Sequence, residues 1–162
     1  MVFEEIIRRA YMESFTGIRR GDKEEEILAI QNYIKEAKEI VVANKKNIKP
    51  KVINKCLRDF GIGEVKHLKI DTDPADLSRT PAITKGLMAV DQSNADVVIA
   101  RGRLGIPGSG SMLVFMDNKG RILTAGFSSS HIVHRKSLEE AVYDETKMAL
   151  EKIGFKKLNK TQ

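Results

Sequence analysis

A short, continuous apolar run at residues 97–100 constrains the fold more than any other part of the chain. Its sequence, Val-Val-Ile-Ala, lacks the apolar–polar alternation of a strand with one wet face, so it predicts a strand covered on both faces. Two further strands are expected at 111–117 and 121–127, joined by the turn Asn118-Lys119-Gly120. Another is expected within 64–71. Together they predict an α/β fold: a three-layer arrangement in which a mixed β-sheet of four or more strands is flanked by helices.

Helical periodicity dominates the first third of the chain. One helix is expected before Gly17, a long second helix across 27–41, and a third from Pro50 to Gly61. We therefore expect residues 1–162 to form a single domain, with a helical part at 1–62 packed on a mixed-sheet part at 63–155.

Two later helices carry start signals. Thr80 is expected to cap a helix whose first residue is Pro81. Ser137 and Glu140 match a capping box ahead of the last helix.

The charge balance favours anionic partners without choosing among them. The formal net charge is +6 at pH 7, which suits nucleotides, nucleic acids or a membrane surface. Cys56 is the only cysteine, so no disulfide framework is expected. The acidic residues in the first nine positions argue against a signal peptide, and no segment is apolar enough to span a bilayer, so we expect a cytoplasmic protein.

A glycine-rich loop follows the apolar run and is the first candidate site. No acidic residue lies between Asp96 and Asp117, whereas glycines can bring backbone N–H groups close to a phosphate and arginines can grip it. The alternative is an ordinary turn, since the spacing matches neither the P-loop nor the dinucleotide fingerprint. The candidate residues are Arg101, Gly102, Arg103, Gly108, Ser109, Gly110 and Ser111.

Two more segments could hold an anion. The expected helix start supplies Arg79, Thr80, Thr84 and Lys85, although a Thr80 side chain that caps the helix would occupy the N–H groups that a phosphate needs. The end of the last strand supplies Ser128, Ser129, Ser130, His131 and His134. The two histidines are three residues apart, so they could be a metal pair, but a hydrogen-bonded surface pair is the commoner arrangement.

A weaker candidate is the acidic segment at 71–76. Asp71 and Asp73 could help to bind Mg²⁺ together with phosphate oxygens. The alternative, which we favour, is a solvated turn, because Asp73 directly before Pro74 is typical turn chemistry.

Two stretches carry a resemblance to a known family: DLSRTPAITKGLMAVD and ADVVIARGRLGIPGSGSMLVFMDNKGRILTAGFSSSHIVHR. With the helical N-terminus, they resemble the methanogen guanylyltransferases that act in making the iron-guanylylpyridinol cofactor of the iron-only hydrogenase. The resemblance implies an enzyme that joins a pyridinol precursor to GMP from GTP and releases pyrophosphate. It also implies an inosine-triphosphate-pyrophosphatase-like or Maf-like fold and a homodimer.

Under this resemblance, Mg²⁺ would accompany GTP and the candidate residues would divide by role. Arg101, Arg103 and the 108–111 loop would hold phosphates, and the 79–85 segment would bind the other end of the nucleotide or the pyridinol. The serines and histidines of 128–134 would line the cleft between them. No catalytic residue can be assigned.

Other functions remain open from the residues alone. A nucleoside-triphosphate pyrophosphatase would use a similar cleft, but it needs a cluster of acids that is missing around the loop. A basic RNA-binding domain would fit the charge but lacks exposed aromatic stacking motifs, so a nucleic-acid partner is not favoured. A ligand-binding subunit without turnover is the third alternative.

Overall fold

A mixed β-sheet organises the molecule, for which a computed structural model describes residues 2–159. Its strands are β1 (Ile40–Ala43), β2 (Val65–Leu68), β3 (Val97–Arg103), β4 (Ser111–Asp117) and β5 (Ile122–Ser128), in the spatial order β2-β1-β3-β4-β5. Strand β1 pairs in parallel with β2 and β3, whereas β3, β4 and β5 pair antiparallel. The α/β class with a mixed sheet of at least four strands is therefore confirmed.

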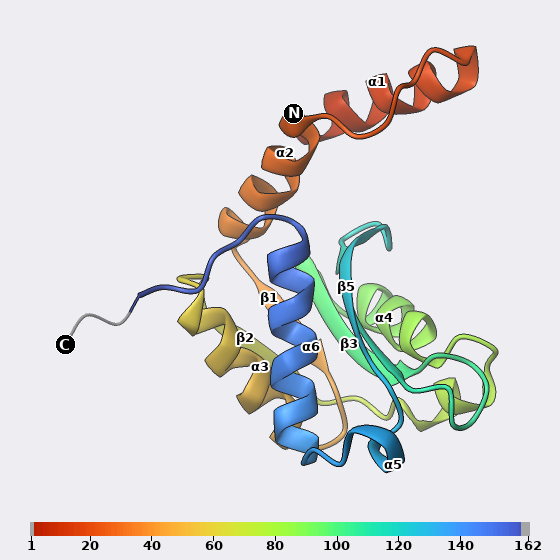
Figure 1. Cartoon of the computed structure of the whole chain (residues 1–162), viewed down its shortest axis with the longest axis vertical. Helices are drawn as coiled ribbons and strands as arrows, with labels where there is room; N and C mark the ends of the chain where they lie inside the picture. The colour runs from red at the N-terminus through yellow and green to blue at the C-terminus, as the bar shows by residue number, and fades with distance from the viewer. Residues whose placement is uncertain (1, 160–162) are drawn as a thin grey trace.

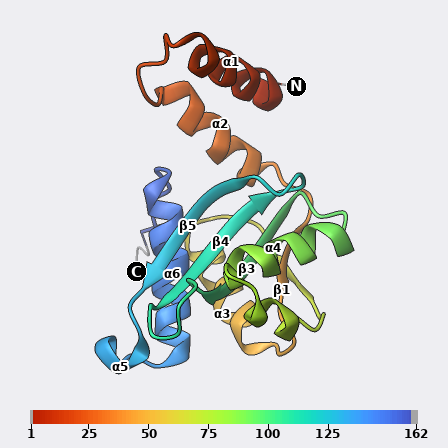
Figure 2. The ribbon, with the colours of Figure 1, turned by 90° about the vertical axis from the view of Figure 1, so that its right-hand side faces the viewer.

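Helices cover both faces of this sheet (Figures 1 and 2). The helices are α1 (Val2–Thr16), α2 (Glu24–Lys35), α3 (Ile48–Asp59), α4 (Pro81–Gln92), α5 (His131–His134) and α6 (Leu138–Lys152), with a short 3-10 helix, η1, at Asp73–Leu77. Helices α3 and α6 pack on one face over residues such as Ile99 and Phe115, and α4 packs on the other over Val98 and Val114. The odd and even positions of β3 thus enter different cores, as the unbroken apolar run predicts.

The expected helix across 27–41 is wrong at its C-terminal end. Helix α2 ends at Lys35, and the chain then enters β1, all four of whose residues are buried. The apolar positions Ile34, Ala37 and Val41 fit a helical period by coincidence, while the β-branched run at 40–42 serves as a strand. The first third is therefore helical with a parallel strand in it, and the single-domain assignment stays a prediction.

Several local predictions are confirmed. Gly120 adopts a left-handed φ of 78° in the turn between β4 and β5. The Ser137–Glu140 capping box starts α6, with Ser137 Oγ accepting from the Glu140 N–H at 3.1 Å. Pro81 is the first residue of α4, but the Thr80 side chain makes no capping hydrogen bond. Thr80 therefore stands at the N-cap position as expected, but the alternative in which its side chain occupies the N–H groups of that helix is not found.

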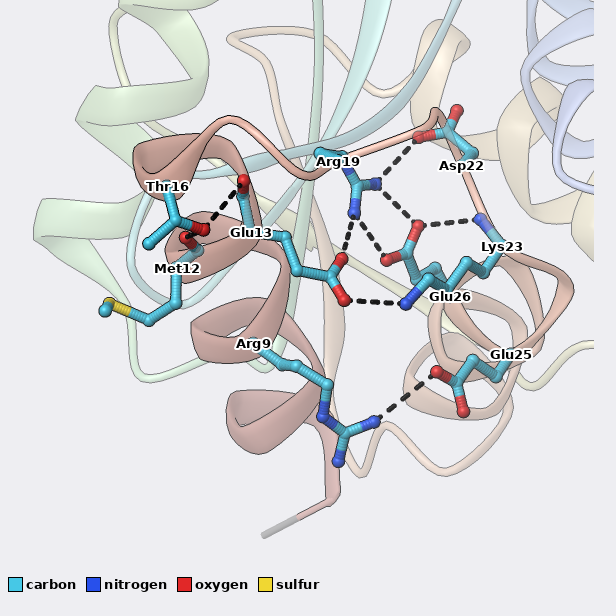
Figure 3. Close-up of polar contacts among 9 residues, drawn as sticks. All are labelled: Arg9, Met12, Glu13, Thr16, Arg19, Asp22, Lys23, Glu25 and Glu26. Carbon is cyan, nitrogen blue, oxygen red and sulfur yellow. Dashed lines mark hydrogen bonds and ion pairs between the residues drawn. The ribbon is translucent and has the colours of Figure 1, made fainter.

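Helices α1 and α2 form an arm that stands away from the sheet (Figures 1 and 2). None of the residues of α1 is buried. An ion-pair cluster fixes the link between the two helices: the Arg19 guanidinium donates to both Glu26 oxygens at 2.7 and 2.9 Å and approaches Glu13 at 3.4 Å (Figure 3). The hydrogen bond from Arg19 is the main cause that lowers the pKa of Glu26 to about 2. These ion pairs thus hold α1 and α2 in a fixed arrangement within the arm.

Across residues 2–159, no helix combines the length and apolar character that crossing a membrane requires.

Candidate functional site

A pocket lies at the edge of the sheet where the parallel strands end. Strands β1 and β3 run in parallel side by side, but the connection β1-α3-β2 crosses one face and β2-α4-β3 crosses the other. Such a reversal leaves a crevice beyond the carboxyl ends of the two strands, which is where open α/β sheets bind ligands. A pocket of about 590 Å³ occupies this position, a volume in the range of small-molecule sites.

Most of the residues that the sequence proposed for a site line this pocket. They come from α4, the end of β3, the glycine-rich loop, the start of β4 and the segment after β5. They are Lys85, Arg101, Gly102, Arg103, Gly108, Gly110, Ser111, Ser129, Ser130, His131 and His134. The structure therefore brings together three segments that the sequence could only treat separately.

Five of the residues proposed to bind an anion do not line it. Arg79 and Ser109 are exposed, and Ser109 Oγ donates within its own loop to the Ile106 carbonyl at 2.5 Å. The Thr84 hydroxyl lies 2.9 Å from Ser78 Oγ and 3.4 Å from Thr80 Oγ1, so these hydroxyls brace the turn ahead of α4. Ser128 ends β5, where it is paired with Ser111.

Arg101 has a partner that the loop sequence does not reveal. Its Nε and Nη2 donate to the two carboxylate oxygens of Glu145 at 2.7 and 3.0 Å, and Glu145, on α6, is fully buried. Ser111 Oγ accepts from Arg101 at 2.9 Å and donates to Glu145 at 2.6 Å. This closed set joins β3, β4 and α6 below the pocket. Much of the Arg101 charge is therefore balanced within the protein.

Arg103 and Lys85 are held by a second set of contacts at the pocket wall. Arg103 Nη2 donates to the backbone carbonyl of Asp76 at 2.6 Å, and Lys85 Nζ lies 3.2 Å from the Asp76 carboxylate. Arg103 Nε is buried and has no hydrogen-bond partner within residues 2–159. A buried donor without a partner is uncommon in a folded protein, which marks Arg103 as a residue to be explained.

Two of the loop glycines are required by close packing. A Cβ atom at Gly102 would lie 2.7 Å from the backbone nitrogen of Ala82, so the missing side chain lets β3 approach the start of α4. A Cβ at Gly110, whose φ is +103°, would lie 2.2 Å from the Ser128 carbonyl oxygen. These glycines therefore serve the fold that shapes the pocket, whatever the loop binds.

The two histidines border the pocket on the side of α5. Ser130 Oγ caps this four-residue helix by accepting from the Ile132 N–H at 3.3 Å, and Arg135 ends it with a left-handed φ of 58°. His134 Nδ1 accepts from the backbone N–H of Lys136 at 2.9 Å. This bond occupies one metal-binding nitrogen of His134, so the hydrogen-bonded alternative fits it better than the metal pair.

The acidic segment lies outside the pocket. Asp71 Oδ1 accepts from the Asp73 N–H at 3.0 Å, and Asp73 pairs with Lys45 at 3.2 Å. Within the described part of the chain, no group of three or more His, Cys, Asp or Glu side chains is placed to hold a metal ion. Asp71 and Asp73 thus match the solvated turn that the sequence favoured.

Comparison with known protein families indicates the function of this chain. The model of a family described as "FeGP cofactor biosynthesis protein HcgB, guanylyltransferase" matches residues 3–155, nearly the whole chain. The protein belongs to the HcgB family. The family is thus one of nucleotidyltransferases, which act on small-molecule substrates, and its role is guanylyl transfer in the biosynthesis of the FeGP cofactor.

The pocket of this HcgB-family protein is strongly cationic. Its lining contains five lysine or arginine side chains and a single carboxylate, that of Asp76. Two of the five, Lys49 and Lys136, were missed in the sequence. Lys136 is paired with Asp144 at 2.6 Å, whereas burial lowers the pKa of Lys49, and the charges of Arg101 and Lys85 lower it further. No motif in the sequence marks either lysine as a site residue, because only the folded chain brings them to the pocket.

Proposed function

We propose that the switch-point pocket binds GTP and a hydroxypyridine acceptor and transfers the guanylyl group between them, with release of pyrophosphate. The observation that carries this proposal is the gathering of five basic side chains around one carboxylate in a pocket of a guanylyltransferase-family chain. A triphosphate is the part of these substrates that needs such a surface, because lysine and arginine neutralise phosphate oxygens. The volume also suits small-molecule substrates.

The pocket offers different chemistry at its two sides. Lys85, Arg101 and Arg103 gather at the end of β3, which suits phosphates. The segment from α5 to the start of α6 contributes His131, Leu138 and Ala141, and its one lysine, Lys136, is paired with Asp144. We assign the phosphates to the β3 side and the aromatic acceptor to the α5 side.

The reaction asks mainly for alignment and charge neutralisation. The acceptor hydroxyl oxygen forms a bond to the α-phosphorus of GTP, the bond from this phosphorus to the oxygen bridging to the β-phosphate breaks, and pyrophosphate leaves. A pyridinol hydroxyl is acidic enough to lose its proton to solvent. Fixed cations such as Arg103 then stabilise the charge that moves onto the leaving pyrophosphate.

Mg²⁺ is expected to enter with GTP as part of the substrate. Mg²⁺ sites on nucleotides usually need only one or two protein carboxylates, because phosphates and water supply the other ligands. Asp76 fits this need: its side chain is 43% exposed, and it is the carboxylate that lines the pocket. Bound there, the ion would neutralise triphosphate charge.

We also propose that the protein is a homodimer joined through its arm. The exposed face of the arm carries large apolar side chains, with Tyr11 65% and Phe15 85% exposed, and Ile18 follows on the link. Exposed patches of this kind usually mark an interaction surface, and a second copy offers the same surface in return. Sedimentation of Phe15→Ser is expected to show monomers, with Ser14→Ala as the control. A dimer that survives Phe15→Ser and Tyr11→Ser together would refute the assignment.

The inosine-triphosphate-pyrophosphatase-like fold stays a prediction.

Arg103 provides the test of the pocket assignment. Arg103→Met is expected to weaken GTP binding roughly 10- to 100-fold, because a charged donor contributes about 1.5–3 kcal/mol. The matched control is Arg58→Met, which removes an exposed arginine on α3 outside the pocket. Calorimetry of GTP binding checks both variants. Equal affinity of Arg103→Met and wild type would count against GTP binding in this pocket.

A further inference from the structure

One of the two pocket lysines that were not predicted from the sequence, Lys49, occupies a distinctive place in the pocket. Lys49 lies in the first turn of α3, which follows β1 after a short connection at 44–47, and so comes from the segment beyond the strand that flanks the switch point opposite β3. It lines the pocket with Lys85, Arg101 and Arg103, which come from α4 and β3. The lysine is half-buried, so solvent only partly screens its charge.

Each of the neighbouring cations has an oxygen partner in the protein. Arg101 is bound to Glu145 through two hydrogen bonds, Lys85 is paired with Asp76, and Arg103 donates to the Asp76 carbonyl. The side chain of Lys49 makes no hydrogen bond or ion pair with any residue of the described chain, 2–159. Its ammonium group is thus the pocket cation without an acceptor of its own.

Such an arrangement disfavours the charged form of the Lys49 side chain. The groups that act on Lys49 are Arg101 on β3 and Lys85 on α4, which oppose its charge, and Asp76 on η1 and Glu145 on α6, which favour it more weakly. Burial opposes the charge most of all, and together these effects lower the pKa of Lys49 below its ordinary value of 10.5. An anion that carries several negative charges would reverse this balance.

We propose that Lys49 is a triphosphate-binding residue of this pocket, which together with Arg103 grips the polyphosphate chain of the nucleotide across the gap between β1 and β3. The buried, unpartnered Nε of Arg103 points independently to a missing acceptor on the same wall. Arg101, held by its two hydrogen bonds to Glu145, contributes to the wall of this subsite. The inference rests on the proposed function, since it names the part of GTP that Lys49 binds.

The proposal predicts a proton uptake on binding. Where Lys49 is partly neutral in the free protein, a bound polyphosphate raises its pKa again, and a proton enters with the ligand. Calorimetry in buffers with different ionisation enthalpies, in a pH series that ends near the ordinary lysine value of 10.5, detects this proton. In Lys49→Arg the uptake is lost while binding is largely retained, because arginine stays charged throughout.

The experiment compares Lys49→Met, Lys49→Arg and the control Lys46→Met, an exposed lysine on the connection just before α3 and outside the pocket. The ligands are GTP, inorganic tripolyphosphate and guanosine. Lys49→Met is expected to weaken binding of GTP and of tripolyphosphate roughly 10- to 100-fold and to leave guanosine binding unchanged. Lys46→Met is expected to behave as wild type.

Three results would overturn the inference: unchanged affinity of Lys49→Met for both polyphosphates, an equal loss of guanosine binding, or a wild-type protein that binds neither polyphosphate. A different result would refute the proposed function without refuting this inference. If tripolyphosphate binds in a Lys49-dependent manner but GTP yields no acceptor-dependent pyrophosphate, the anion subsite stands and guanylyl transfer does not.

Discussion

The buried ion pair below the pocket gives the sharpest prediction about the fold. Glu145→Gln keeps the size of the side chain but removes the charge that balances Arg101. Breaking a buried pair by removing one partner costs about 3–5 kcal/mol, because the other charge remains buried. The Arg101 side chain is 15% exposed and can recover some hydration, so we expect the low end, about 3 kcal/mol. For a chain of 162 residues this corresponds to a fall in Tm of about 6–12 °C.

Thermal unfolding followed by circular dichroism measures this change. The control is Asp144→Asn on the neighbouring position of α6, whose partner Lys136 is 46% exposed, so only a small change is expected. The double variant Arg101→Met with Glu145→Leu removes both charges and should recover most of the lost stability. A Tm of Glu145→Gln within about 2 °C of wild type would refute the reasoning, since the expected shift per kcal/mol is itself that large.

Two further predictions concern the loop and the arm. Gly108 and Gly110 both have positive φ, but only at Gly110 would a Cβ meet backbone. Gly108→Ala should therefore lower the free energy of unfolding by about 1 kcal/mol, and Gly110→Ala by clearly more. Chemical denaturation of the two variants measures both losses, and equal losses would contradict the packing explanation. The hydrogen bond from Arg121 is the main cause that lowers the pKa of Glu4 to about 2, so the bond between arm and sheet should persist above pH 4.5 and weaken as the pH falls toward 2. An NMR titration of the Glu4 carboxyl checks this, and Arg121→Met should return its pKa toward 4.5; a midpoint near 4.5 in the wild type would disprove the contact.

The sequence predicts local structure well where one segment carries the whole signal. The apolar run at 97–100, the Gly120 turn and the Ser137 cap each depend on near neighbours, and each is found as expected. Strand β1 was missed because its apolar positions continue the period of the preceding helix. The unbroken run Ile-Val-Val-Ala at 40–43 was the available signal, since it resembles the run at 97–100.

The site could be predicted only in part, because charge balance is a property of the folded chain. The loop around Arg101 contains no acid, yet its carboxylate partner comes from α6, 44 positions away. Lys49 likewise reaches the pocket from a helix that gave no site signal. The sequence therefore identified many lining residues, but not which cations are already neutralised.

Pyrophosphate release from GTP and Mg²⁺, measured with and without a 4-hydroxypyridine acceptor, tests the central claim most directly. The account predicts release that depends on the acceptor, together with a product whose mass is that of the acceptor joined to GMP. Steady release without the acceptor would contradict it and indicate a pyrophosphatase. Binding of GTP with no release under either condition would also contradict it.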